Sequence, residues 1–256
     1  MEAPVIYEKT GNIAKISLNN PEKSNPLSLG VLQLLIEAFR KSAVNNDVCV
    51  IYRAEGKNFT FGADLKHGYE LIVNPALRYE AVTDLWTWQE LTTVMLEHPG
   101  VILVGYHGWI VGGGFEHTLC SDIRIASDDT KIMLPELDLG IFYSNASTKI
   151  LPRIIGEGRA KELMLMGDVL KAQDALNIGL VNRVCGRNEL DKILMEYAEK
   201  LASKDHFALR LAKKIIREAQ DSSIEDALYK EGRAMIDTGR SGAPEVRIGA
   251  FLKMQK

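Results

Sequence analysis

The chain has 256 residues, of which 46% are apolar and 25% charged, a composition typical of a globular protein with one large domain or two small ones. This excludes a disordered, collagen-like or coiled-coil chain, and the net charge of −3 argues against a surface built as a whole to hold a polyanion. The three cysteines show no C-x-x-C spacing, so we expect a reducing compartment rather than a disulfide framework or a zinc site. We find no apolar signal segment at the start and no stretch long enough to span a bilayer, so we expect a cytoplasmic protein without a membrane partner.

Strand patterns and helical patterns alternate in the first half of the chain. Residues 14–18 alternate apolar and polar side chains, as a half-buried strand does, and further strands are predicted at 48–54, 100–106, 123–126 and 131–134. One helix is predicted to begin after the N-cap Ser28, another to cover about 77–97, and a short one to cover 113–120. Strands separated by helices indicate crossover connections, and hence an α/β fold with a largely parallel sheet.

From Ala146 onward the pattern predicts only helices. The first predicted helix runs from 146 to 155, and the others cover 158–166, 172–177, 189–202, 207–220, 224–238 and 244–253. One of them carries an apolar stripe at Leu190, Ile193, Leu194 and Tyr197. We expect this stripe in an oligomer contact, because the C-terminal helices carry more apolar surface than one body can cover. The fold is therefore predicted as a strand-rich N-terminal body followed by an all-helical C-terminal part.

Three consecutive glycines, Gly112 to Gly114, precede Phe115 and Glu116 at an expected strand-to-helix junction. Glycines let backbone N–H groups approach a ligand closely, and the start of a helix favours negative charge. The run is neither a P-loop nor a dinucleotide fingerprint, because no Gly-Lys-Ser/Thr follows and the G-x-G-x-x-G spacing is absent. Taken alone, it fits a tight turn as well as it fits a binding site.

Two glutamates are candidate catalytic residues. Glu116 follows Gly113 by about one helical turn, so its carboxylate can face the same side as the Gly113 N–H. Its neighbours are apolar, which makes the charge costly to bury, although a first-turn glutamate also complements the helix dipole. Glu136 follows a predicted strand, and two carboxylates in one cleft can act as acid and base or hold one water. The Ala63 N–H, after Gly62, can point into the same pocket opposite Gly113 and complete an oxyanion hole.

Together these residues resemble the crotonase superfamily of enoyl-CoA hydratases and isomerases, from about Val5 to the C-terminus. The resemblance rests on six ordered segments with the spacing of that family. They are 19–25 (NNPEKSN), 61–66 (FGADLK), 112–116 (GGGFE), 121–126 (SDIRIA), 135–140 (PELDLG) and the stretch from 151 to 184 with GRAKEL and ALNIGLVNRV. The segments are specific for the fold and less specific for the reaction, because this fold hosts many reactions.

The resemblance implies a crotonase-like spiral of ββα turns with the acyl-CoA site at residues 1–195, and a helical trimerisation region at residues 196–256 that builds a homotrimer or hexamer. It also implies that the thioester oxygen lies in an oxyanion hole between the N–H groups of Ala63 and Gly113. Glu116 and Glu136 would then activate a water that adds to a 2-enoyl-CoA. Coenzyme A enters as part of the substrate, with no separate cofactor and no metal. The residues expected to bind this substrate are Lys23, Asn25, Gly62, Asp64, Leu65, Lys66, Gly112, Tyr143, Ser144 and Asn145.

The chain departs from the family after Gly140, where relatives usually have a proline and a Gly-Gly-Thr stretch. It has Tyr143, Ser144 and Asn145 there, three polar side chains beside the expected acyl pocket. One hypothesis is that they select a polar or cyclic acyl group and make crotonyl-CoA a poor substrate. The alternative is that Tyr143 only packs and that Ser144 or Asn145 caps the next helix. His117 is also atypical, and we expect it to pack rather than to take part in catalysis.

Other activities fit the same residues. Family isomerases typically keep one acid of the pair, so two acids favour hydration over double-bond isomerisation, and a C–C bond hydrolase is a further alternative. A basic stripe recurs at helical spacing at Arg210, Lys213, Lys214 and Arg217. It fits a solvated helix face, a contact with CoA phosphates, or an RNA-binding relative, although the net charge and the lack of an RNA-binding signature disfavour nucleic acid. Trp86 and Trp88 point to different helix faces, so at most one is expected to line a pocket.

Overall fold

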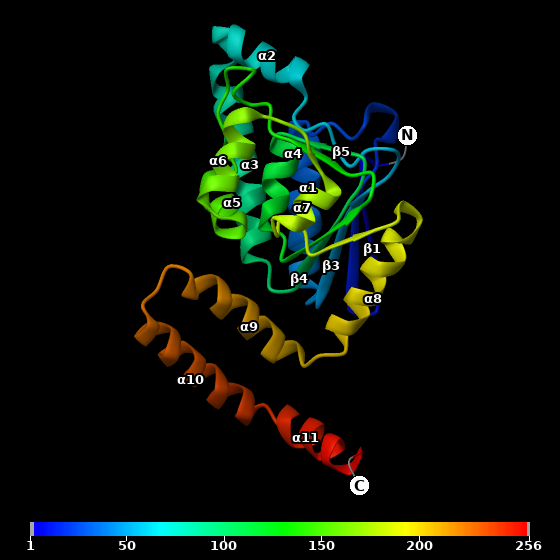
Figure 1. The fold of residues 1–256 in the computed structure, drawn as a ribbon, viewed down its shortest axis with the longest axis vertical. Coiled ribbons are helices and arrows are strands. Elements are labelled where there is room, and N and C mark those ends of the chain that lie inside the picture. The colour runs from blue at the N-terminus through cyan, green and yellow to red at the C-terminus, as the bar shows by residue number, and fades with distance from the viewer. Residues whose placement is uncertain (1–2, 255–256) are drawn as a thin grey trace. The chain divides into compact units, whose positions relative to one another are not determined.

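A six-stranded sheet forms the centre of the first part of the chain in the computed structural model, which describes residues 3–254 (Figure 1). Its strands lie in the order β1-β2-β3-β4-β6-β9. Their bounds are β1 Val5–Thr10, β2 Ile13–Leu18, β3 Cys49–Ala54, β4 Val101–Tyr106, β6 Ile123–Ser127 and β9 Arg183–Cys185. β1 and β2 form an antiparallel hairpin that turns at Gly11, where φ is +57°, and all the other neighbours are parallel.

A second sheet has three short strands and lies next to the candidate site. It is built from β5 Trp109–Val111, β7 Lys131–Met133 and β8 Leu170–Lys171, with β5 parallel to β7 and β8 antiparallel to it. β4 and β5 follow each other along the chain but lie in different sheets, and so do β6 and β7. Each of these strand pairs therefore carries the chain from the large sheet to the small one before the next helix begins.

The helices pack their apolar faces against the large sheet and against one another. α1, Leu29–Val44, packs on β1 and β2 and along α3, Arg78–Glu97. Leu32, Leu35 and Phe39 of α1 are fully buried, as their i, i+3, i+7 spacing requires. The other helices of this part are α2 Leu65–Val73, α4 Gly113–Glu116, α5 Ser147–Ile155, α6 Glu157–Met166, α7 Ala172–Asn177 and α8 Leu190–Ala202.

The chain divides into two compact units, of which the first ends at Glu199 and the second begins at Lys200. The second unit contains α9 His206–Ala219, α10 Ile224–Arg240 and α11 Ala243–Met254, and α9 packs along α10. None of the side chains of α9 and α10 that the structure describes is buried. Across residues 3–254, no helix has both the length and the apolar character needed to cross a membrane.

The α/β class is confirmed, and the predicted strands at 14–18, 48–54, 100–106, 123–126 and 131–134 and the helix at about 77–97 all correspond to observed elements. The prediction of only helices after Ala146 is wrong, because β8 and β9 lie in that region. These strands have two and three residues, too few for an alternating pattern to appear. The sequence patterns also did not predict β1, β5 and α2.

The apolar stripe on α8 is a second correction. Leu190, Ile193 and Leu194 are buried within the chain rather than left for an oligomer contact. Leu194 lies so close to Gly105 of β4 that a Cβ at position 105 would collide with its Cδ1. The stripe therefore packs α8 onto the large sheet, and Gly105 makes room for it.

Candidate active site

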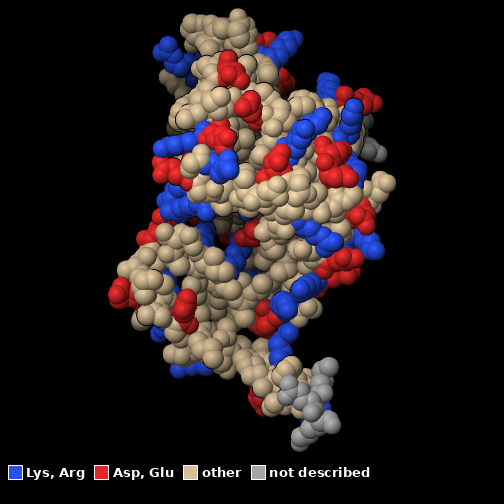
Figure 2. Space-filling view, in the orientation of Figure 1, with Lys and Arg blue, Asp and Glu red and all other residues tan. Residues whose placement is uncertain are grey.

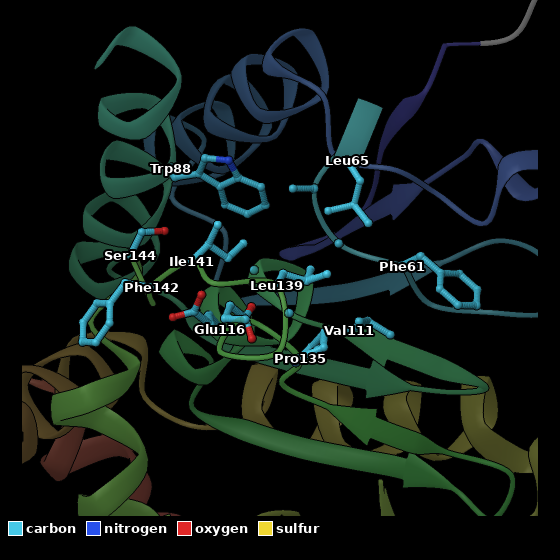
Figure 3. A pocket seen from close by; sticks show the side chains of 15 residues that line it. Phe61, Leu65, Trp88, Val111, Glu116, Pro135, Leu139, Ile141, Phe142 and Ser144 are labelled. Carbon is cyan, nitrogen blue, oxygen red and sulfur yellow. The ribbon is translucent and has the colours of Figure 1, made fainter. Parts of the chain in front are cut away.

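A small cavity in the first unit brings together most of the residues predicted to act on a substrate (Figure 3). It has a volume of about 120 Å³, and its walls come from the segment 61–65, the junction of β5 and α4, the loop 135–144 and one side chain of α3. The lining residues are Phe61, Gly62, Ala63, Leu65, Trp88, Val111, Gly112, Gly113, Glu116, Pro135, Glu136, Leu139, Ile141, Phe142 and Ser144. Eight of the fifteen were predicted as site residues: Gly62, Ala63, Leu65, Gly112, Gly113, Glu116, Glu136 and Ser144.

Gly112 turns the chain sharply between β5 and α4. Its φ is +54°, in the left-handed region that favours glycine, and its N–H donates to the carbonyl of Met133 at 2.9 Å. A Cβ at this position would lie 2.7 Å from Oε1 of Glu136. The backbone conformation and the adjacent carboxylate therefore both require glycine here, and the turn leaves the N–H of Gly113 at the first position of α4, where it has no partner within the helix.

The segment that carries Ala63 runs beside this turn. The Thr60 N–H donates to the carbonyl of Trp109, and the Val111 N–H donates to the carbonyl of Thr60, both at 3.1 Å. At Gly62, where φ is +84°, a Cβ would lie 2.6 Å from the carbonyl oxygen of Val111. This close packing of two backbone segments makes Ala63 and Gly113 line the same cavity, as an oxyanion hole built from two N–H groups requires.

His117 supports the start of α4 from the protein interior. Its Nδ1 lies 2.9 Å from the carbonyl oxygen of Gly113, and its Nε2 lies 3.0 Å from the hydroxyl of Tyr52 on β3. Since a carbonyl only accepts, Nδ1 carries the proton and the Tyr52 hydroxyl donates to Nε2. Burial lowers the pKa of His117 to about 4, so the ring is neutral at pH 7. His117 packs, as expected, and through this bond it also holds the peptide unit after Gly113.

Glu116 is buried at the last position of α4, and its carboxylate accepts hydrogen bonds at one oxygen, Oε2. The Ser147 hydroxyl donates to its Oε2 at 2.5 Å, and the Asn145 N–H points to the same oxygen at 3.5 Å. Burial raises the pKa of Glu116, and the hydrogen bond from Ser147 is the largest effect in the opposite direction. The carboxylate is therefore removed from bulk water but compensated by local dipoles.

Glu136 lines the same cavity in a poorer polar environment. Its side chain is buried, and its Oε2 has no hydrogen-bond partner among the residues that the structure describes. Burial, with the negative charge of Glu116 as a smaller contribution, raises the pKa of Glu136 to about 7. Two carboxyl groups whose surroundings differ in this way can hold opposite protonation states at pH 7, which suits one as a base and the other as an acid.

Apolar side chains make up most of the remaining wall. The Trp88 ring of α3 lies in the cavity wall (Figure 3). A Cβ at Gly113 would be 3.2 Å from Cη2 of this ring. Trp86 is 66% exposed, so the expectation that only one of the two tryptophans lines a pocket is confirmed. The sequence did not predict Trp88 as a site residue. Its two-residue spacing from Trp86 showed only that the two rings face different sides of α3, and the sides of this helix differ little in polarity.

Six predicted substrate-binding residues do not line the cavity. They are Lys23, Asn25, Asp64, Lys66, Tyr143 and Asn145. Asp64 caps α2 by accepting hydrogen bonds from the N–H groups of Lys66 and His67. Asn25 is buried, and its Nδ2 faces the carbonyls of Glu55, Asn58 and Phe59. These two side chains shape the loops on either side of the Ala63 segment.

The buried amide of Asn25 leads to a prediction for stability. The Nδ2 of Asn25 carries two hydrogens, so replacing Asn25 by alanine leaves at least two of these three buried or partly buried carbonyls without a donor, and each unsatisfied group costs about 1–3 kcal/mol. We expect Asn25→Ala to lower the free energy of unfolding, measured by urea denaturation, by at least the cost of one unsatisfied group, about 1–3 kcal/mol. The matched control is Asn177→Ala at an exposed site, expected within about 0.5 kcal/mol of the wild type. An Asn25→Ala value equal to that of the control would contradict the assigned role.

The loop that was expected to form a polar wall is mostly turned away from the cavity. The Tyr143 hydroxyl donates to the carbonyl of Met164, and its ring packs against Phe142 with 5.5 Å between centroids. Asn145 points toward α3, where its Oδ1 accepts a hydrogen bond of 3.3 Å from Thr92. Ser144 alone of residues 143–145 lines the cavity. The cavity therefore offers an apolar group more contacts than it offers a polar one.

The basic stripe of α9 lies next to acidic side chains. Lys214 lies 3.9 Å from Glu218, and Lys230 of α10 lies 3.0 Å from the other oxygen of the same carboxylate. On the face of the molecule shown in Figure 2, basic and acidic side chains are interspersed rather than separated into areas of one sign. This local pairing reduces the positive potential that a polyanion would meet along α9.

The comparisons with known proteins agree with one another. A family model described as enoyl-CoA hydratase/isomerase matches residues 8–252. Crotonyl-CoA hydratase of Syntrophomonas wolfei is 31% identical over 98% of this chain and 96% of its own length. Short-chain-enoyl-CoA hydratase of Clostridium acetobutylicum is 30% identical over 98% of this chain and 95% of its own. The crystal structure of an enoyl-CoA hydratase from Bacillus anthracis superimposes with a TM-score of 0.90 at 30% identity, covering 98% of this chain and 97% of that one. This likeness confirms the fold that the six sequence segments predicted.

Proposed function

Because the chain belongs to the enoyl-CoA hydratase/isomerase family, we propose that it catalyses the addition of water to the double bond of a 2-enoyl-CoA thioester. One observation carries the proposal: two buried carboxyl groups, Glu116 and Glu136, line one cavity together with the backbone N–H groups of Ala63 and Gly113. An acid, a base and two convergent donors are the groups that this addition needs. An isomerase needs only one proton carrier, so the second carboxyl group favours hydration.

In the proposed mechanism, the thioester oxygen accepts hydrogen bonds from the N–H groups of Ala63 and Gly113. These donors stabilise the negative charge that moves onto this oxygen as the enolate forms. Glu116, ionised, takes a proton from a water while the water oxygen bonds to the β-carbon. Glu136, neutral, then gives its proton to the α-carbon, and the carbonyl re-forms. A proton passes from Glu116 to Glu136 before the next turnover, so the sum is the addition of one water.

The cavity favours a short apolar acyl group. Its volume of about 120 Å³ is small beside the roughly 300–1,000 Å³ of drug-sized ligand sites. Trp88, Leu139 and Ile141 offer it carbon rather than hydrogen-bonding groups. The names of two relatives, a crotonyl-CoA hydratase and a short-chain-enoyl-CoA hydratase, support the same choice. We therefore propose crotonyl-CoA as a good substrate, in place of the polar or cyclic acyl group suggested by Tyr143, Ser144 and Asn145.

The test is a turnover screen with the purified full chain. The conversion of each substrate is followed by ultraviolet absorbance and product chromatography. The substrates are crotonyl-CoA, longer linear, hydroxylated and alicyclic 2-enoyl-CoA esters, and a 3-enoyl-CoA. We expect hydration of crotonyl-CoA with kcat/KM in the range of about 10⁴–10⁸ M⁻¹s⁻¹, and lower values for the bulkier esters. Conversion of the 3-enoyl ester without hydration would replace the proposal by an isomerase, and release of an acyl fragment by a C–C bond hydrolase.

The proposed role of Glu136 predicts a pH dependence of kcat/KM, the quantity that reports the ionisation of the unliganded enzyme. The pKa of its carboxyl group is raised to about 7, and only the neutral form can donate the proton. Well above pH 7 the neutral fraction falls about tenfold per pH unit, so kcat/KM for hydration should fall in the same way. Below pH 7 Glu136 is mostly neutral, and kcat/KM falls only where Glu116 becomes protonated. A kcat/KM that is constant between about pH 6 and 9 would contradict this assignment.

We propose that the second unit mediates assembly into the trimer or hexamer that the resemblance implies. Its helices expose several large apolar side chains, and exposed apolar patches of this kind mark protein contacts. They include Ile216, Leu228, Met235, Ile236, Val246, Ile248, Phe251 and Leu252. Sedimentation equilibrium at micromolar concentration is expected to give a trimer or a multiple of it, and a stable monomer would contradict this.

A further inference from the structure

Ser147 holds a position that the reaction outlined above does not explain. It is the first residue of α5 and is fully buried, and the residue before it, Ala146, has φ +59°. A left-handed conformation is costly for any residue except glycine and persists only where its surroundings require it. Here it turns the chain so that the Asn145 N–H and the Ser147 hydroxyl both meet Oε2 of Glu116.

The contact between Ser147 and Glu116 is short and shielded from bulk solvent. The Oγ of Ser147 lies 2.5 Å from Oε2, and the exposed fraction of Glu116 is only 2%. The carboxylate also lies at the N-terminus of a nine-residue helix, where the helix dipole favours negative charge. Asn145, which lies between Glu116 and Thr92 of α3, anchors the same turn from the other side.

The interactions that favour the charged form of Glu116 are hydrogen bonds from Ser147, Asn145 and Ser144. The titratable neighbours of Glu116 are Glu136 and Tyr143 from the loop, which both interact with its charge, and His117 from the next turn, which is neutral. The Ser147 hydroxyl is therefore the strongest single interaction that favours the charged form of this carboxylate.

We propose that Ser147 is a positioning residue whose hydroxyl fixes Oε2 of Glu116 and keeps this carboxylate charged and ready to accept a proton, while Glu136 stays neutral. The link to catalysis rests on the proposed function, but the effect on the carboxylate does not. Ser147 thereby separates the two glutamates into a base and an acid. A chain with an apolar residue at this position would leave Glu116 with only the weaker hydrogen bonds from residues 144 and 145.

The first test compares pH profiles of kcat/KM for hydration of crotonyl-CoA, which report the ionisation of the unliganded enzyme. In Ser147→Ala, the limb on the acidic side is expected to move to higher pH by about one to two units, because a hydrogen bond that favoured the charged form is lost. KM is expected to stay near the wild-type value. Ser147→Thr keeps a hydroxyl and should restore most of the profile. A loss of kcat/KM that is equal at every pH would overturn the proposal, since a purely structural defect acts in that way.

The matched control is Ser42→Ala. Ser42 on α1 is also fully buried, but its hydroxyl has no hydrogen-bond partner among the described residues. Its removal should leave the pH profile in place. A shift equal to that of Ser147→Ala would assign the effect to the loss of any buried hydroxyl, and would overturn the proposal.

A second measurement does not depend on turnover. Carboxyl infrared bands of the unliganded protein are recorded against pH, and the band of Glu116 is identified by its absence in Glu116→Gln. We expect this carboxyl group to titrate at higher pH in Ser147→Ala than in the wild type, and an unchanged titration would overturn the proposal. If the titration shifts while no variant, including the wild type, hydrates any enoyl-CoA, the proposed function fails and the inference about Ser147 stands.

Discussion

Replacing Glu136 by glutamine is expected to lower kcat for hydration of crotonyl-CoA by about 10²–10⁴-fold, the range typical of a general acid. Glutamine has nearly the same shape as glutamic acid but has no acidic proton to give to the α-carbon. The affinity for the thioester should stay nearly unchanged, because the N–H groups of Ala63 and Gly113 belong to the backbone. Steady-state kinetics and titration calorimetry with a saturated acyl-CoA measure the two quantities separately.

Glu116→Gln should cause a loss of similar size, because the water then lacks a base. Glu37→Gln, at an exposed site on α1, is the matched control and should be as active as the wild type. Losses below tenfold for both site variants would contradict the mechanism with two glutamates. If Glu136→Gln alone were damaging, the chain would be better described as an isomerase.

Gly114→Ala is expected to have the second large effect. A Cβ at Gly114 would collide with Cγ2 of Thr60 and would lie 3.0 Å from Cα of Gly62, which is backbone and cannot rotate away. The segment 60–63 would have to move, and the Ala63 N–H with it. We expect kcat to fall by about 10²–10³-fold, as when a donor to the oxyanion is lost, and the free energy of unfolding to fall by about 1–3 kcal/mol.

The control for this substitution is another glycine in a helix. A Cβ added at Gly158 of α6 would have no neighbouring atom within 4 Å, so Gly158→Ala meets open space. It should keep full activity and gain about 0.4–1 kcal/mol of stability, since alanine restricts the unfolded chain. Wild-type kcat in Gly114→Ala would show that the position of Ala63 does not limit the reaction.

Several of the elements that were predicted correctly have a complete repeating pattern, although β7, with three residues, was also predicted and β1, with six, was not. α3 covers about five turns, and β2 and β3 have six residues each, enough to separate helical from strand periodicity. β8 and β9 are strands only because the chain meets β7 and β6 at their edges, and two or three residues carry no periodicity of their own. α2 resembles a turn in the sequence because its cap, Asp64, follows two small residues that are typical of turns.

In the candidate site too, residues close together in the sequence could be predicted, and residues brought in by the packing of distant helices could not. Gly112, Gly113 and Glu116 lie within one short motif, so their proximity was readable from the sequence. Trp88 and Ser147 lie at the site because of the way α3 and α5 pack. The spacing of residues along the chain does not reveal this packing. Asn25 had the expected residue type, but only its burial distinguishes a loop support from a substrate contact.

The donors proposed for the thioester oxygen belong to peptide groups, and this affects how the activity can change by inheritance. No codon change deletes the N–H of Ala63 or Gly113, short of proline. Heritable variation therefore reaches these donors through the residues packed around them, such as Thr60, Trp88 and His117. Activity differences between natural variants should consequently map to this surrounding shell, while the two peptide groups themselves stay constant.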